Sequence, residues 1–123
     1  MRGWQASADD LLSETCRLKI QHQTDYALGL TKEDIYVPDM NFVFGLASSD
    51  GGCAIVSTNR LKSIDPGMFR GRLLKEVVHE LGHVFGLSHC PDRRCVMHFS
   101  NSLQDTDLKS SEMCSNCLAK LSP

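Results

Sequence analysis

The sequence predicts a single domain of the α+β class, residues 1–123, and three observations support this prediction. A chain of 123 residues buries one hydrophobic core but not two. Two apolar segments, residues 42–47 and 53–58, flank a glycine-containing turn and predict an antiparallel hairpin. A longer segment, residues 66–85, repeats apolar residues at helical spacing and predicts an amphipathic helix. Strands followed by a separate long helix are typical of an α+β domain.

The composition agrees with this prediction and excludes several classes of protein. Hydrophobic residues make up 41% of the chain and charged residues 23%, which is ordinary for a globular domain. The net charge of −2 argues against a nucleic-acid partner, because such proteins usually carry a basic excess. No apolar run has the length of a membrane-spanning helix, and residues 1–16 lack the pattern of a secretory signal. We therefore expect a cytoplasmic monomer that binds neither nucleic acid nor a membrane.

Shorter elements are predicted on both sides of these segments. Residues 7–16 begin with acidic side chains followed by leucines, which predicts a short helix. Residues 27–31 predict a short strand, and residues 32–36 a turn-like connection. Residues 107–121 predict a final helix that carries the last two cysteines.

The long helix is predicted to begin at Pro66, because Asp65 is a favourable N-cap and proline is favoured at the first helical position. At the standard rise its length is about 30 Å. Arg72 and Glu76 lie one helical turn apart and are expected to form an ordinary ion pair. Two glycines near the end leave a flat surface for close approach of another segment; they are Gly82 and Gly86.

The most informative motif lies where this helix ends. The segment from His79 to His89 has the order His-Glu-x-x-His-x-x-Gly-x-x-His. His79 and His83 share one helix face, and Gly86 lets the chain turn so that His89 approaches them. Three neutral imidazoles with an open fourth position are typical of a catalytic zinc site. Glu80 is then placed to act as base toward a metal-activated water.

Two close pairs of cysteines follow the histidine motif, and two explanations are open for them. Their spacing is usual for four thiolates around a structural zinc ion. The alternative is two disulfides, which need an oxidising compartment; because no secretory signal is visible, zinc is favoured. The expected ligands are Cys90, Cys95, Cys114 and Cys117. Cys16 and Cys53 are expected to be small buried hydrophobic residues and not ligands.

Met97 lies two residues after Cys95, close behind the histidine motif. The combined run resembles the metzincin metallopeptidases, and within them the archaemetzincin (archaelysin) family. Segments 41–47 and 99–102 are also similar to that family, so the resemblance covers residues 28–121. It implies a compact metzincin-like domain with a small sheet, a long active-site helix and a methionine turn beneath the catalytic metal. The strands with which the family's domain begins have no counterpart here.

The resemblance also implies how the domain is divided and where a substrate binds. The upper part, residues 1–86, ends with the active-site helix; the lower part, residues 87–123, holds the methionine turn and the four-cysteine zinc. Residues 41–47 correspond to an edge strand at the upper rim of the cleft, where an extended peptide adds as a further strand. A plain core strand is the other explanation, and both can hold. The candidate substrate contacts are Phe42, Val43, Phe44 and Gly45.

Together these features predict a zinc-dependent peptidase that acts on peptides or unfolded proteins, with Glu80 as general base. Two zinc ions per chain are expected, one catalytic and one structural. Some metzincins carry a tyrosine just after the methionine turn, but His98 and Phe99 stand there, so no such tyrosine is expected. His98 is expected at the surface or behind the ligands. The alternative function is a zinc-stabilised peptide-binding module with weak or no catalysis.

Overall fold

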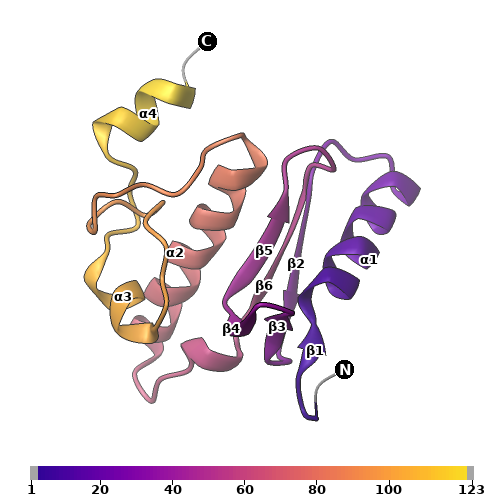
Figure 1. The fold of residues 1–123 in the computed structure, drawn as a ribbon, viewed down its shortest axis with the longest axis horizontal. Coiled ribbons are helices and arrows are strands. Elements are labelled where there is room, and N and C mark those ends of the chain that lie inside the picture. The colour runs from indigo at the N-terminus through magenta and orange to yellow at the C-terminus, as the bar shows by residue number, and fades with distance from the viewer. Residues whose placement is uncertain (1–2, 122–123) are drawn as a thin grey trace.

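The computed structural model describes residues 3–121, and its architecture confirms the α+β class. Figure 1 shows helix α1, a central sheet, helix α2 and the C-terminal segments as successive layers. None of the helices described between residues 3 and 121 combines the length and the apolar character of a membrane span. The elements in chain order are β1 (Ala6–Ser7), α1 (Ala8–Gln21), β2 (Ala27–Thr31), β3 (Ile35–Val37), β4 (Met40–Val43), β5 (Gly45–Ser48), β6 (Cys53–Ser57), the short 3-10 helix η1 (Asn59–Leu61), α2 (Pro66–Val84), α3 (Leu103–Leu108) and α4 (Ser115–Leu121).

The strands form two small sheets, where the sequence predicted one. Their strand orders are β2-β6-β5 and β1-β3-β4. The predicted hairpin is present, because β5 pairs antiparallel with β6, and β2 pairs with the other side of β6 in parallel. Every residue of β6 is buried, so this strand forms the centre of the molecule. The predicted connection at residues 32–36 is partly wrong, since β3 begins within it and pairs with β1 and β4.

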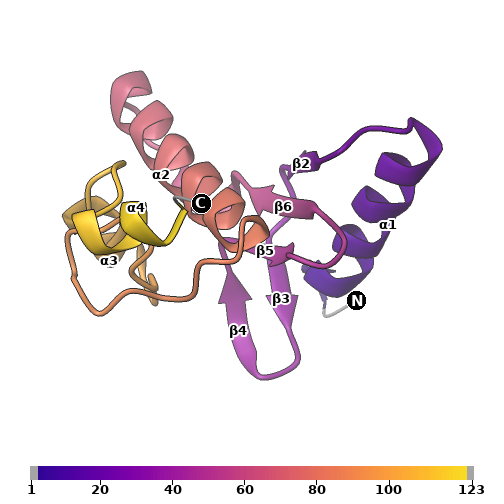
Figure 2. The ribbon, with the colours of Figure 1, turned by 90° about the horizontal axis from the view of Figure 1, so that it is seen from above.

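The predicted strand at residues 42–47 is divided between the two sheets. β4 ends at Val43 and pairs with β3, whereas β5 begins at Gly45 and pairs with β6. Phe44 between them is 5% exposed and packs into an apolar core beneath α2. β4 and β5 follow each other along the chain, and each lies at the edge of its own sheet. Figure 2 shows the chain bending sharply where β4 passes into β5.

Helix α1 begins at the predicted place but ends later. The side chain of Ser7 caps it by accepting a hydrogen bond from the amide of Asp10. The helix continues to Gln21, beyond the predicted end at residue 16. Its last turns carry the exposed apolar side chains Leu18 and Ile20, so they lack the amphipathic pattern that would have marked them as helical.

Packing of α1 against β6 brings two distant cysteines together. Cys16 and Cys53 form a disulfide, with their Cα atoms 5.4 Å apart and a separation of 37 positions in sequence. The expectation that they are separate hydrophobic residues is therefore wrong. Neither helix nor strand periodicity shows that these two positions face each other, which is why the sequence did not predict the pair.

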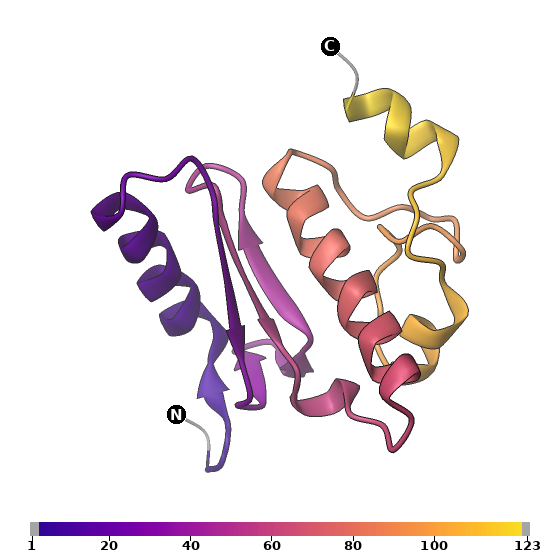
Figure 3. The same cartoon turned by 180° about the vertical axis from the view of Figure 1, so that it is seen from behind.

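Helix α2 follows its predicted bounds closely. The Asp65 carboxylate accepts a hydrogen bond from the amide of Gly67 at 2.9 Å, and Pro66 is the first helical residue. The helix ends at Val84, and Gly86 follows with a φ of +97°, a conformation that other residues rarely adopt. Figure 3 shows α2 between the sheet on one side and the C-terminal segments on the other.

The polar face of α2 is buried rather than solvated. The guanidinium of Arg72 pairs with Asp107 at 2.8 Å, and Glu76 pairs with Lys109 at 3.3 Å. The predicted pair between Arg72 and Glu76 is therefore wrong. The C-terminal segment covers this face, so each charge meets a partner from that segment instead of its neighbour along the helix.

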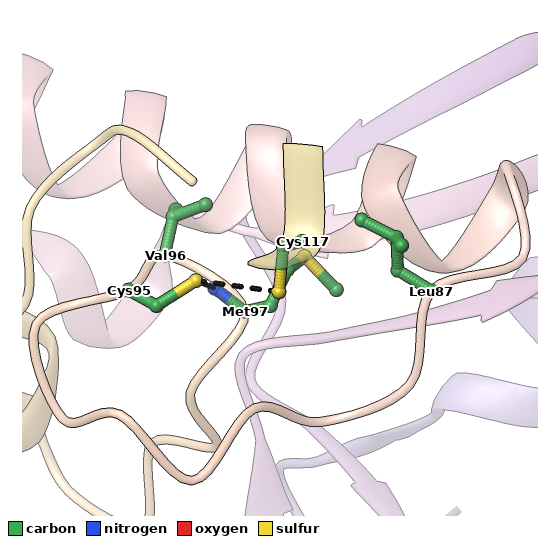
Figure 4. Close-up of a cluster of buried hydrophobic side chains, with 5 residues drawn as sticks. All are labelled: Leu87, Cys95, Val96, Met97 and Cys117. Atoms are coloured by element: carbon green, nitrogen blue, oxygen red, sulfur yellow. Dashed lines mark hydrogen bonds between the residues drawn. The ribbon is translucent and has the colours of Figure 1, made fainter. Parts of the chain in front are cut away.

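The predicted helix at residues 107–121 is only partly present, because the structure has a helix over its second half alone. α3 ends at Leu108, α4 begins at Ser115, and the segment between them is irregular. Its backbone forms hydrogen bonds with the cysteine-containing loop. The amide of Ser110 donates to the carbonyl of Arg94 at 2.9 Å, and the carbonyl of Glu112 accepts from the amide of Val96 at 3.0 Å. These bonds replace helical ones and fold the segment around a small core, shown in Figure 4. Its buried members are Leu87, Cys95, Val96, Met97 and Cys117.

Candidate metal centres and cleft

The three histidine side chains of the motif converge at the end of α2. His79 and His83 lie one turn apart on the helix, and the turn at Gly86 returns His89 toward them. One ring nitrogen of each histidine lies within 4.8 Å of the others. The His79 and His89 rings stack, with centroids 5.4 Å apart.

Backbone carbonyls orient two of these rings. Because a carbonyl oxygen only accepts, Nδ1 of His79 donates to Val96 at 2.7 Å, and Nδ1 of His83 donates to Leu87 at 2.8 Å. The lone pairs then lie on the two Nε2 atoms, which are 3.1 Å apart and suited to share a cation. Burial lowers the pKa of His79 to about 3 and also lowers the pKa of His89. Both rings are therefore neutral near pH 7, as metal ligands must be.

Glu80 faces the same space. Its side chain is 5% exposed and has no hydrogen bond or ion pair with any residue from 3 to 121. A Cβ atom at Gly45 would lie 2.8 Å from Glu80 Oε2, so a glycine at this position is what lets β5 approach the carboxylate. Burial, followed by the charge of Glu76, raises the pKa of Glu80 to about 8, against the opposing charge of Lys109. The protein alone thus stabilises the protonated carboxyl near neutral pH.

Met97 is fully buried in the core on the C-terminal side of α2. Its thioether packs against α2 at Gly82, where a Cβ atom would collide with both Sδ and Cε. The amide of Met97 donates to Cys95 Sγ at 3.4 Å, and its carbonyl accepts from the amide of Cys90 at 3.0 Å. This turn therefore connects the histidine cluster to the cysteine cluster.

The four cysteines form the second cluster, and Figure 4 shows two of them. The sulfur atoms of Cys90 and Cys114 are 3.8 Å apart, and those of Cys95 and Cys117 are 3.7 Å apart. These distances exclude disulfides and match the edge of about 3.8 Å for sulfurs arranged tetrahedrally at about 2.3 Å from zinc. The backbone amide of Cys117 is the main cause that lowers the pKa of Cys114 to about 7, whereas burial is the main cause that raises the pKa of Cys117 to about 12. The donor set fits zinc.

A cleft of about 580 Å³ connects the histidines and Glu80 to the edge formed by β4 and β5. Residues 42–47 line one side, α2 and residues 86–89 line the other, and residues 99–101 complete the lining. All candidate substrate contacts border the cleft, although Phe44 is mostly buried in the core. Within the described part of the chain, no cysteine borders it. The two clusters are thus distinct in their surroundings: the histidines open into the cleft, whereas the cysteines lie outside it, two of them buried and two partly buried.

The sequence profile of peptidase family M54 matches residues 1–123. This chain belongs to peptidase family M54. The finding confirms the resemblance noted in the sequence. The archaemetzincin of Methanopyrus kandleri is 55% identical to this M54 chain over 93 residues, which cover 76% of this chain and 53% of that protein. The chain therefore spans about half the length of the curated relatives it matches.

Solved structures agree with the assignment to the M54 family. The crystal structure of the archaemetzincin from Methanopyrus kandleri is similar with a TM-score of 0.90 and 47% identity, over 96% of this chain and 64% of that one. The crystal structure of a zinc-dependent peptidase from Methanocorpusculum labreanum is similar with a TM-score of 0.81 and 32% identity, over 94% and 71% of the two chains.

A buried group of charges in this M54 chain was not expected from the sequence. The Lys109 side chain is 0% exposed; its ammonium lies 3.3 Å from Glu76 and donates to the carbonyl of His98 at 3.1 Å. The hydroxyl of Thr106 donates to the same carboxylate at 3.0 Å. The position of Glu76 one turn before His79 was a signal for this group, but no local pattern marks Lys109. His98 donates to the Cys90 carbonyl at 2.8 Å and does not border the cleft.

Proposed function

We propose that this chain is a zinc-dependent peptidase in which His79, His83 and His89 hold the catalytic metal and Glu80 is the general base. One observation carries the proposal. Three imidazole nitrogens meet beside an unpaired carboxylate, and both border a cleft large enough for a peptide segment. Neutral imidazoles are preferred ligands of zinc, and three of them leave a position open for chemistry.

The chain's own residues have separate tasks in this reaction. A zinc ion held by the histidines supplies positive charge that polarises a peptide carbonyl and acidifies water. The carbonyls of Val96 and Leu87 keep two of the ligand rings turned toward the cleft. Glu80 takes a proton from the attacking water and passes it to the leaving amine. The raised pKa of Glu80 suits the second step, and a nearby cation favours the ionised form needed for the first.

An extended peptide is proposed to lie along the β4–β5 edge. β5 pairs with β6 on one side only, so its other side offers free backbone groups for a further strand. Phe42, Val43 and Gly45 border the cleft on this edge, and Gly45 abuts Glu80. A peptide there passes directly over the general base. Phe44 contributes to the core as well as to the cleft wall.

A second, structural zinc is proposed for Cys90, Cys95, Cys114 and Cys117, which gives two zinc ions per chain. The four converging thiols and their sulfur spacing support this role. A metal there cross-links the segment after His89 to α4, and so fixes the third histidine ligand. The proposed division into an upper part, residues 1–86, and a lower part, residues 87–123, falls just before this ligand.

We also propose a monomer that acts in a reducing cytoplasm. The free cysteines of the metal cluster support a reducing compartment, because thiolates must escape oxidation to bind zinc. The disulfide between Cys16 and Cys53 is an argument against it. The redox state of Cys16 and Cys53 in protein isolated under non-oxidising conditions decides whether the compartment is reducing or oxidising.

The function is tested by exposing a diverse peptide library to zinc-loaded protein and to a Glu80→Ala variant of equal zinc content. Native protein is expected to cleave, and the variant to lose about 10²- to 10⁴-fold in rate. Glu33→Ala, which removes an exposed glutamate outside the cleft, is the matched control and is expected to cleave like native protein. Equal cleavage by native protein and Glu80→Ala would contradict the assigned role. Binding without cleavage would instead identify a peptide-binding module.

A further inference from the structure

A buried ion pair outside the proposed active site holds one guanidinium group in a fixed orientation. Asp34 is 2% exposed, and its two carboxylate oxygens accept hydrogen bonds from the guanidinium of Arg60 at 2.8 and 2.9 Å. The side-chain amide of Gln5 donates to the same carboxylate at 2.8 Å and to the carbonyl of Asn41 in β4 at 2.7 Å. Two parallel bonds to one carboxylate determine the plane of the guanidinium. Neither Asp34 nor Arg60 borders the cleft.

The guanidinium of Arg60 covers the aromatic ring of Phe42. The central carbon of the guanidinium lies 3.9 Å from the centroid of that ring, a distance at which a cation attracts an aromatic face. The ring of Phe44 meets the same ring edge-on, with centroids 5.2 Å apart. Because Phe44 is itself buried and Arg60 is fixed by Asp34, the Phe42 ring is held by two rigid neighbours.

Phe42 belongs to an apolar wall of the cleft. Its ring lies on the side of β4 that faces α2, since it packs against the core that α2 covers, and α2 forms the opposite side of the cleft. The residue is half-buried, so part of its surface stays uncovered by that core. Three other apolar residues of β3 and β4 border the same cleft; they are Val37, Met40 and Val43. The second sheet therefore supplies a continuous apolar surface to the cleft.

The ionisable side chains that border the cleft come from the other side. They are the three histidines of the motif together with Glu76 and Glu80, all from α2 or the turn after it. Among residues 3–121, no lysine, arginine or aspartate borders the cleft. A bound peptide thus meets polar groups on the α2 side and only apolar side chains on the side of β3 and β4.

We propose that Phe42 is a specificity-determining residue that selects a large apolar side chain, such as leucine, in the bound peptide, and that Arg60 is the positioning residue that holds its ring. This inference rests on the proposed peptidase function. Leucine buries apolar surface against Phe42, which stabilises the complex. Asparagine has nearly the same size, but there its amide loses water without gaining a partner.

The role of Phe42 is tested with short alanine-rich peptides that carry leucine or asparagine at one position, placed in turn on either side of the central bond. At the position that reaches Phe42, native protein is expected to prefer leucine about 30-fold in kcat/KM, and Phe42→Ala only about three-fold. Phe85→Ala, the same change at an exposed phenylalanine outside the cleft, is expected to keep the native preference. Both peptides meet the same folded fraction of a variant, so partial unfolding cancels from the ratio. An equal preference in native protein and Phe42→Ala overturns the role of Phe42.

The role of Arg60 is tested in a double variant, because removing Arg60 alone leaves a buried carboxylate without a counter-charge. Arg60→Gln with Asp34→Asn removes both charges and keeps an acceptor for Gln5. This protein is expected to raise KM for the leucine peptide at least about three-fold, with kcat and the KM of the asparagine peptide unchanged. A native leucine preference overturns the positioning role, as does an equal loss of kcat with both peptides, which marks a purely structural pair.

Binding separates this inference from the proposed function. The same peptides are titrated against Glu80→Gln, with and without Phe42→Ala, and the dissociation constants are compared. A leucine preference that depends on Phe42 in binding, without cleavage by native protein, supports the role of Phe42 and contradicts the peptidase. Cleavage or binding with no leucine preference at any position contradicts the role of Phe42 alone, and the absence of both binding and cleavage contradicts both proposals.

Discussion

At the residue scale, the approach of β5 to Glu80 depends on the absence of a side chain at Gly45. A Cβ atom there would lie 2.7 Å from the backbone carbonyl of Ile55 and 2.8 Å from Glu80 Oε2. Neither neighbour can yield easily, because one is backbone and the other is buried. We predict that Gly45→Ala destabilises the protein by about 1–3 kcal/mol, lowers peptide cleavage and leaves the zinc content unchanged.

Chemical denaturation, cleavage assays and metal analysis together check this prediction. Gly71→Ala is the matched control, since a Cβ atom at Gly71 meets nothing within 4 Å and alanine favours a helix by about 1 kcal/mol. That variant should be at least as stable as native protein. Cleavage by Gly45→Ala at the native rate would mean that the position of the Glu80 carboxylate does not depend on strand β5.

The raised pKa of Glu80 predicts a pH-dependent stability in protein that carries zinc at the cysteine cluster only. Its pKa is about 8 in the folded protein, against an ordinary value of 4.5. Between these values the folded state keeps a proton that the unfolded state releases, so stability falls as pH rises. Glu80→Gln cannot ionise and avoids this loss.

Relative to native protein, Glu80→Gln should therefore gain about 3 kcal/mol between about pH 5 and about pH 8. Urea denaturation of both proteins across this range measures the gain. A constant difference between them would show that Glu80 is not buried as described.

Residue spacing was sufficient to predict that the three histidine side chains meet. It was not sufficient to predict which residues from other segments complete the site. The offsets from His79 to His89 on a helix and its closing turn determine how the three rings converge, and the structure brings them together. Lys109 and Ser100 reach the site through tertiary contacts from an irregular segment. No periodicity relates them to the motif. The family resemblance of residues 99–102 marked the segment of Ser100, whereas the sequence contains no signal for Lys109.

At the scale of elements, the ion pair of Glu76 and Lys109 joins α2 to the segment that follows α3. Both side chains are almost fully buried, at 3% and 0% exposure. We predict that Lys109→Met destabilises the protein by about 3–5 kcal/mol, because it leaves a buried carboxylate without a counter-charge. Adding Glu76→Gln should restore most of this loss, since the amide oxygen still accepts from Thr106.

Urea denaturation of the single and double variants measures both effects. The double variant tests whether the missing counter-charge causes the loss of stability. If it were no more stable than Lys109→Met, the packing of the lysine chain rather than the missing charge would be the cause.

The disulfide is a second connection between elements, from α1 to the start of β6. A loop closed over 37 residues is expected to contribute about 3–4 kcal/mol by restricting the unfolded chain. Cys16→Ser with Cys53→Ser should lower stability by that amount under oxidising conditions and by much less in a reductant. Comparing native protein with and without reductant provides the control. Equal stability in both conditions would mean that the bond does not form in solution.

Elements with a clear pattern were predictable, and those defined by contacts were not. The N-cap at Asp65 and the apolar repeat located α2, and the glycine turn located the hairpin of β5 and β6. The division of residues 42–47 between two sheets depends on where Phe44 is buried. The irregular segment before α4 follows hydrogen bonds to the cysteine loop, which no helical propensity predicts.

At the scale of the whole molecule, the two metal clusters are expected to have separable effects. Cys114→Ser should remove one zinc per chain and loosen the C-terminal part, since the thiolates hold α4 to the loop of Cys90 and Cys95. His83→Ala should remove the other zinc and leave the fold intact. Metal analysis and amide hydrogen exchange measure these effects. Loss of both zinc ions in His83→Ala would show that the clusters are not independent.

The most direct test for one catalytic and one structural zinc is a zinc titration of metal-free protein, in which cleavage of a peptide substrate is followed at each addition. The thiolate cluster should fill first, so the first equivalent should order the fold without cleavage, and activity should rise with the second equivalent. Glu80→Gln should bind both equivalents and remain inactive. Cleavage completed by the first equivalent, or no cleavage with both sites filled and the fold intact, would contradict a zinc peptidase with one catalytic and one structural metal.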